Sequence, residues 1–198
     1  KIAIEEMVAP LLVGKDMSNI PDLLLTLQKS LHLFGRYGIT MFAISGVEIA
    51  LWDALGKEKN KPIHELLGKK NKDLFKAYSS LFRYGDPKII EQKCKQSLDD
   101  GYQAIKLHEI ENDCIEAGRK GTGNLPLMLD TNCPWTYEET LSKKDFLKSM
   151  KLTWLEEPIY PPEDYETLAK LNKELGIPLA CGENACTEFE FKSMIKQK

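Results

Sequence analysis

Three acidic residues recur at a near-constant interval along the chain, and each one follows a short apolar run. Asp130, Glu156 and Glu183 are separated by 26 and 27 residues, which is about the length of one strand, one helix and two loops. Repeated βα units of this length build a parallel barrel whose strand ends converge on one pocket. Three carboxylates gathered there repel one another unless a cation joins them. A hard divalent ion suits such oxygen ligands, and we expect Mg²⁺, with Mn²⁺ as the alternative.

Basic and polar side chains accompany the acids. Lys106 and His108 lie two residues apart in Ile-Lys-Leu-His, and this spacing places both on one face of a strand. Beside a bound cation Lys106 can lose its proton more readily, and His108 ordinarily titrates near neutrality, so either is a candidate general base. Asn132 follows the first acid at the same two-residue spacing. Glu156 and Glu157 are adjacent, so only one of them can point inward.

This combination of groups predicts proton abstraction next to a carboxylate. A metal ion and an ammonium hold the substrate carboxylate, a base removes the α-proton, and the metal stabilises the resulting enediolate. Each residue also has a simpler interpretation. Lys106 could form a structural salt bridge, His108 could be a satisfied structural histidine, and a single acid at a strand end could cap a helix. Three acids at one period favour the metal site.

The elements that must position these residues begin near residue 73, where short apolar segments alternate with helical patterns. Short strands that are apolar on both faces are typical of parallel strands covered by helices. Such units form a barrel or an open doubly wound sheet, and the lack of a glycine-rich phosphate loop argues against a nucleotide-binding sheet. The predicted strands are 74–82, 104–109, 125–132, 152–158 and 179–184, with helices at 87–99, 112–120, 137–150, 162–175 and from 187.

The first part of the chain has a different pattern. Residues 1–15 are predicted to form a short strand and a loop, and residues 40–57 a largely buried helix. We therefore expect a mostly helical unit over 1–72 and a barrel-forming unit over 73–198. Five βα units are visible where a closed barrel needs eight, so we expect the chain to be part of a longer polypeptide.

Composition narrows the class of protein. A chain that is 42% hydrophobic and 29% charged is typical of a globular protein, and its net charge of −3 gives no electrostatic reason to expect nucleic acid or an anionic membrane as a partner. No apolar run approaches the roughly 20 residues needed to cross a bilayer. The five cysteines form no CxxC pair, which argues against zinc and predicts reduced thiols in a cytoplasmic setting.

Several motifs resemble those of one known group, the mandelate racemase/muconate lactonizing enzyme branch of the enolase superfamily. The segment Ala43-Ile-Ser-Gly-Val-Glu-Ile-Ala-Leu-Trp-Asp-Ala-Leu-Gly-Lys, followed by Lys61-Pro-Ile-His-Glu-Leu-Leu-Gly, is similar to the signature helix of the family's capping domain. Leu129-Asp-Thr-Asn, Trp154-Leu-Glu-Glu-Pro and Cys181-Gly-Glu-Asn resemble the three metal-ligand motifs in the expected order. The resemblance covers nearly the whole chain.

The resemblance implies a fold and a set of residue roles. The fold is α/β: a partial (β/α) barrel of TIM type preceded by the helical part of an α+β capping domain. Lys106 matches the first lysine of a Lys-x-Lys motif that contacts the substrate carboxylate. His108 departs from the motif, because many members carry the proton-abstracting lysine there. Ser80 and Asn132 are further candidates for substrate contacts. The residues that match the metal ligands are Asp130, Glu156 and Glu183.

The implied reaction begins with abstraction of the α-proton of a small carboxylate substrate. Dehydration of an acid sugar or α-hydroxy acid is the first expectation, and racemisation, epimerisation or cycloisomerisation is the second, because all of these share the enediolate. A non-catalytic metal-binding or structural homologue is the alternative from another class. Members of this family are often oligomeric, so a homo-oligomer is a further expectation.

Overall fold

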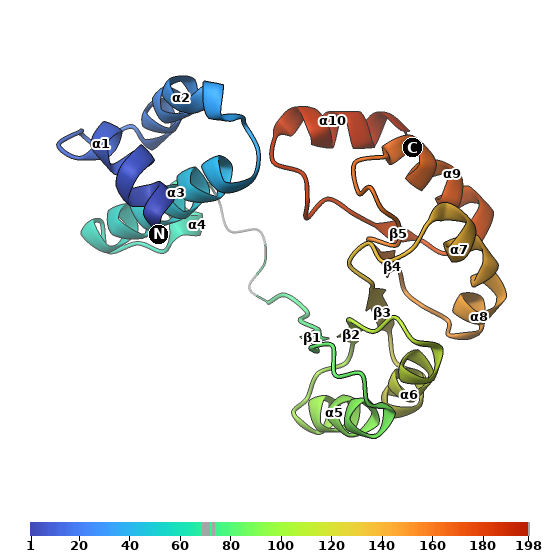
Figure 1. Ribbon diagram of the computed structural model, residues 1–198. Coiled ribbons are helices and arrows are strands. Elements are labelled where there is room, and N and C mark those ends of the chain that lie inside the picture. Colours follow the sequence, from blue (N-terminus) through green and yellow to red (C-terminus); the bar gives the residue numbers. More distant parts are fainter. Residues whose placement is uncertain (69–71, 73, 198) are drawn as a thin grey trace. The chain divides into compact units, whose positions relative to one another are not determined.

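The computed structural model describes residues 1–68, 72 and 74–197, and the chain forms two compact units (Figure 1). One unit comprises Lys1–Phe75 with Cys186–Glu188, and the other comprises Lys76–Ala185 with Phe189–Lys198. The unit boundary predicted between residues 72 and 73 involves a residue outside the described part of the chain.

Every described secondary-structure element of the first unit is a helix. The strand predicted within 1–15 is wrong, because this segment forms the π-helical turn η1 and the short helix α1. Val8 is fully buried, and Ala3, Ile4 and Met7 pack against the same cluster, so the apolar positions follow a helical rather than an alternating period. The elements of this unit are η1 (Ile4–Val8), α1 (Ala9–Leu12), α2 (Ile20–Leu31), η2 (His32–Phe34), α3 (Gly38–Glu58) and α4 (Ile63–Leu67).

The long helix α3 was predicted to be largely buried, but it buries only one side. Ala43, Ile44 and Val47 lie in the core of the unit, whereas Phe42 and Ile49 are about two-thirds exposed, at 66% and 65%. Among the described helices, α3 alone is long and apolar enough to cross a membrane by length and composition. The sequence-based expectation that no segment is long and apolar enough to do so is therefore too strong. The mostly buried core helix of a globular protein passes the same test; α3 packs on α2 and η1, and 22% of the tested window is buried.

The second unit contains a parallel sheet with the strand order β1-β2-β3-β4-β5, and each strand is followed by helix, as predicted. Figure 1 shows these helices along the outer side of the curved sheet, which is the arrangement of a partial (β/α) barrel. The strands are β1 (Ser79–Ser80), β2 (Ile105–Leu107), β3 (Leu127–Asp130), β4 (Leu155–Glu156) and β5 (Leu179–Ala180). The helices are α5 (Pro87–Asp99), α6 (Asn112–Thr122), α7 (Tyr137–Ser142), α8 (Lys144–Ser149), α9 (Tyr165–Leu175) and α10 (Glu188–Gln197).

Local sequence explains where these helices begin. The helix predicted from residue 162 starts at Tyr165, because the side chain of Asp164 accepts a hydrogen bond from the backbone N–H of Thr167 and caps the first turn. The segment predicted as one helix over 137–150 is divided at Lys143 into α7 and α8. A capping box starts α7 at Thr136.

The core of this unit lies between the sheet and its helices. Ile105, Leu107, Leu127, Leu129 and Leu155 each have an exposed fraction of at most 1%. Because side chains alternate along a strand, the residues between these apolar positions face the other side of the sheet. Lys106 in β2 is one such residue. Asp130, which ends β3 one position after Leu129, also faces away from the helices for the same reason.

Close approach of α5 and α6 generates a stability prediction. A Cβ atom at Gly121 would lie 2.8 Å from the carbonyl oxygen of Glu91 and 2.7 Å from Cβ of Cys94. Although alanine is the better helix former, we expect Gly121→Ala to lower the free energy of unfolding by about 1–3 kcal/mol through overpacking, measured by urea denaturation. Glu116→Ala, at an exposed position of α6, should change it by less than about 0.5 kcal/mol. Equal effects of the two substitutions would contradict this prediction.

Candidate functional site

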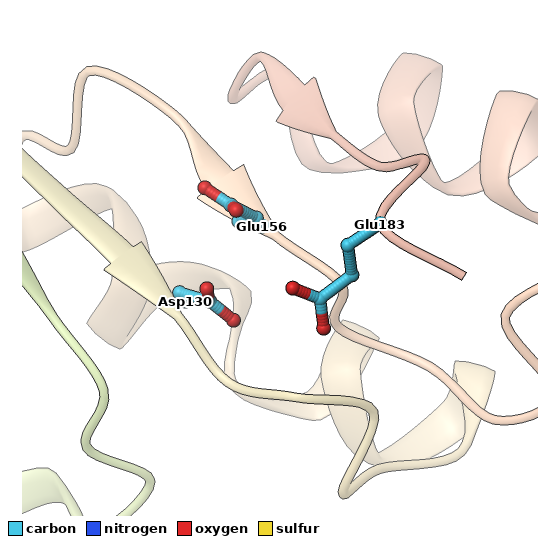
Figure 2. Close-up of side chains that lie close together, drawn as sticks. All are labelled: Asp130, Glu156 and Glu183. Atoms are coloured by element: carbon cyan, nitrogen blue, oxygen red, sulfur yellow. The ribbon is translucent and has the colours of Figure 1, made fainter. Parts of the chain in front are cut away.

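The three acids predicted as metal ligands come together at the C-terminal ends of neighbouring strands. One carboxylate oxygen from each of Asp130, Glu156 and Glu183 lies within 4.8 Å of the other two. Asp130 ends β3 and pairs in register with Glu156, which ends β4. Figure 2 shows Glu183 reaching from the loop after β5 toward the other two acids. Oxygen atoms around one Mg²⁺ lie about 3–4 Å apart, so this donor set fits a hard divalent cation after small side-chain rotations.

Lys106 lies between two of these acids. Its Nζ atom is 2.9 Å from Oδ2 of Asp130 and 2.9 Å from Oε1 of Glu156. Burial by itself lowers the pKa of Lys106, but the hydrogen bonds to Asp130 and Glu156 outweigh this effect, so the pKa is raised. The sequence-based expectation of a readily deprotonated lysine assumed a bound metal beside it. In this structure Lys106 is itself the cation that offsets the acidic cluster.

His108 contacts the same acid as Lys106. Its Nε2 atom is 3.3 Å from Oδ2 of Asp130, and Nδ1 donates to the backbone carbonyl oxygen of Leu81, since a carbonyl can only accept. Lys106 in β2 and His108 just after its end therefore point to the same side of the chain, as their spacing predicted. The two candidate bases and the first acid form a contiguous group.

Two of the three candidate substrate contacts, Ser80 and Asn132, line a cavity beside this group, and Lys106 is not part of its wall. The cavity has a volume of about 400 Å³. Asn132 links it to the acids, because its backbone N–H donates to Oδ1 of Asp130 at 3.1 Å and its side-chain amide lies 3.5 Å from Oε1 of Glu183. Ser80, His108 and Asn132 thus share one space. The residues that line the cavity are Ser80, Leu81, Phe82, Arg83, His108 and Asn132.

The cluster remains rich in negative charge despite Lys106. Burial first, and then the carboxylates of Asp130 and Glu157, raise the pKa of Glu183. Three carboxylates face a single ammonium at the cluster itself, so a divalent cation would relieve the remaining repulsion. The chemistry of the donors therefore supports a metal centre at this position.

Two contributors to the site were missed by the sequence-based reasoning. Arg83 donates from Nε to the carbonyl oxygen of His108, and from Nη2 to the carbonyl oxygen of Thr131 at 2.9 Å and to Oδ1 of Asn132 at 3.2 Å. It thereby joins the loops that follow β1, β2 and β3. A basic residue shortly after a strand was its only sequence signal, and that signal is common.

The second missed residue is Glu157, whose exposed fraction is 1%. It is the member of the Glu-Glu pair that points away from the acidic cluster, and its carboxylate accepts hydrogen bonds from Gly182 and Cys133. Burial, followed by the hydrogen bond to Glu157, raises the pKa of the Cys133 thiol to about 12. The adjacent acids indicated that one must turn away, but nothing in the sequence indicated what it would bind.

Comparison with known proteins gives the family. A profile of the mandelate racemase/muconate lactonizing enzyme N-terminal domain matches residues 1–68, and a profile described as enolase C-terminal domain-like matches residues 90–198. The chain therefore belongs to the mandelate racemase/muconate lactonizing enzyme family of the enolase superfamily. The resemblance read from its motifs is confirmed.

Individual relatives agree with this assignment. The chain is 32% identical to an arabinonate dehydratase of Saccharolobus solfataricus over 100% of its own length and 55% of the relative's. It is 30% identical to a 3,6-anhydro-alpha-L-galactonate cycloisomerase of Streptomyces coelicolor over 93% and 53% of the two lengths. A crystal structure of a racemase from Streptomyces coelicolor with bound magnesium superposes with a TM-score of 0.90 at 27% identity, covering 99% of this chain and 60% of that one. The chain thus spans about half the length of the curated relatives it matches.

The position of Lys106 generates a second stability prediction. Lys106→Met would leave Asp130 and Glu156 as neighbouring like charges with little access to water. We expect the free energy of unfolding in metal-free buffer to fall by about 3–5 kcal/mol, measured by urea denaturation. Lys120→Met breaks an ion pair with Glu91 in which the lysine is 73% exposed, so it should cost less than about 1 kcal/mol. Similar losses for both variants would show that Lys106 does not stabilise the cluster.

Proposed function

We propose that this protein is a Mg²⁺-dependent enzyme that abstracts the α-proton of a small carboxylate substrate and proceeds through an enediolate. The observation that carries this proposal is the convergence of Asp130, Glu156 and Glu183 with two basic side chains that touch the same acid. Dehydration of an acid sugar or α-hydroxy acid is the preferred outcome, supported by the name of the arabinonate dehydratase relative. Racemisation or cycloisomerisation is the second outcome, in line with the names of other relatives.

In this proposal the three acids hold Mg²⁺, or Mn²⁺ in its place. When bound, the ion supplies positive charge that stabilises the negative charge developing on the substrate carboxylate. Lys106 donates hydrogen bonds to that carboxylate from the floor of the site. His108 accepts the α-proton at Nε2, because its other ring nitrogen is fixed on the carbonyl oxygen of Leu81. Lys106 is the alternative base.

The cavity beside the acids is the proposed place for the rest of the substrate. Ser80 and Asn132 offer a hydroxyl and an amide to polar substituents, and His108 forms part of the same wall. An acid sugar carries hydroxyl groups that such side chains can bind. We also propose that residues 1–72 belong to the capping domain and residues 73–198 to the barrel. A cytoplasmic location agrees with the free thiols of Cys94, Cys114, Cys133 and Cys181, and a homo-oligomer is also part of the proposal.

A non-catalytic homologue is the second candidate function. His108 stands where many family members carry a lysine, which gives a little support to a chain that keeps the fold and the metal without turnover. The intact set of three clustered acids argues against it, because such charges destabilise a fold that binds no metal. The two candidates differ in one respect that can be measured directly. Lys106→Ala would abolish turnover in an enzyme and would change no substrate reaction in a scaffold.

The enzymatic proposal predicts isotope exchange at the α-carbon. Incubated in D₂O with Mg²⁺ and a panel of aldonates and aldarates, the protein should exchange the α-proton of at least one acid, as followed by NMR. Glu183→Gln should slow this exchange by about 10²-fold or more, because it removes charge from the ligand set. Glu166→Gln, on the exposed side of α9, is the matched control and should leave the rate unchanged. Unaltered exchange in Glu183→Gln would refute the assigned role.

The metal site can be tested without a substrate. Mg²⁺ at about 100 times its dissociation constant should stabilise the folded protein by about 2.7 kcal/mol, seen as a higher midpoint of thermal unfolding. Asp130→Asn should lose most of this shift, since Asp130 is the most buried of the three acids. An equal Mg²⁺-dependent shift in the variant would place the ion elsewhere.

A further inference from the structure

Glu157 is a buried carboxylate that the proposed reaction does not use. Its Oε1 atom accepts a hydrogen bond from the backbone N–H of Gly182 at 2.8 Å, and its Oε2 atom accepts one from Sγ of Cys133 at 3.3 Å. Its backbone also has an unusual conformation, with φ of +46°. A buried charge with specific partners and a strained backbone costs free energy, and such features are retained where the surrounding structure requires them.

The contacts of Glu157 reach the immediate neighbours of the metal ligands. Glu157 follows Glu156 directly, and Gly182 directly precedes Glu183. On the other side, Cys133 lies in the loop that begins after Asp130, and its backbone N–H also donates to the carbonyl oxygen of Glu157 at 2.6 Å. One side chain therefore connects the three segments that carry the ligands.

Gly182, which binds Glu157 from the segment after β5, has a backbone conformation that requires glycine. Gly182 has a φ of +125°, a conformation that L side chains rarely adopt. A Cβ atom there would also lie 3.2 Å from the ring of Phe191. The N–H direction that meets Glu157 therefore depends on glycine at this position, and the orientation of Glu183 follows from the same turn.

We propose that Glu157 is the positioning residue of the metal centre. Its carboxylate binds the loops after β3 and β5 and holds Asp130 and Glu183 at a separation that one cation can span. This inference rests on the metal site proposed above and assigns Glu157 no contact with the ion. Outer-shell partners of this kind typically change metal affinity by 10–100-fold when they are removed.

The chain provides a matched control in Glu109. This carboxylate is also buried, with an exposed fraction of 2%, and it also accepts backbone N–H groups, from Tyr84 at 2.7 Å and from Gly85 at 3.3 Å. Its partners lie in the loop after β1, which carries none of the proposed ligands. Loss of Glu109 therefore reproduces the removal of a buried acid without releasing a ligand-bearing loop.

The test is a Mn²⁺ titration of the full protein, followed by electron paramagnetic resonance, with thermal unfolding recorded for every variant. Glu157→Ala should weaken Mn²⁺ binding by about 10-fold or more, whereas Glu109→Ala should stay within about 2-fold of wild type at a comparable loss of stability. Glu157→Gln keeps an acceptor for Gly182 and should fall between wild type and Glu157→Ala. Paired with Glu109→Gln, it carries the test if the alanine variant does not fold.

The outcomes separate this inference from the proposed function. Unchanged Mn²⁺ affinity in the Glu157 variants, or an equal loss in the Glu109 variants, would overturn the positioning role and leave the metal site intact. Failure of the wild-type protein to bind Mn²⁺ would overturn both. Selective weakening in the Glu157 variants, with a changed Mn²⁺ spectrum at retained folding, is the expected result.

Discussion

The site depends on one electrostatic constraint, which is the presence of several carboxylates at the same edge of a parallel sheet. Asp130 and Glu156 are direct partners in neighbouring strands, so the sheet itself brings their charges together. The ammonium of Lys106 forms ion pairs with both carboxylates. Lys106 belongs to β2, which pairs with β3. A cation at this position, whether an ammonium or a metal ion, is what makes such a strand arrangement stable.

The loops that follow the strands are held by charged side chains. These side chains bind backbone groups of neighbouring loops and do not pair with one another. Arg83 donates to carbonyl oxygens of two other loops, while Glu157 accepts the backbone N–H of Gly182. This network supports irregular backbone that would otherwise be costly, including positive φ angles at Asn132 and Cys133. The regular strands place Asp130 and Glu156, and the loop contacts of Arg83 and Glu157 hold the segments that follow them.

Sequence periodicity predicted the parts of this structure that repeat. The five strands, α5 and the acidic cluster follow from apolar runs and from a constant interval, because both are local properties of the chain. The contacts of Arg83 and Glu157 join loops separated by about 25 residues or more, and no pattern in the sequence indicates which groups in those loops bind each other. The error over residues 1–15 had another origin, since a short apolar segment fits both a strand and a helical turn.

The order of the three proposed ligands along the chain has a consequence for synthesis. All three acids lie on consecutive units of one sheet, and each strand pairs with the one translated just before it. The proposed donor set is therefore complete once residue 183 has been made, and Gly182, whose N–H contacts Glu157, is made just before it. A nascent chain that has reached this point already carries every oxygen donor proposed here, so metal capture can accompany folding and need not follow it.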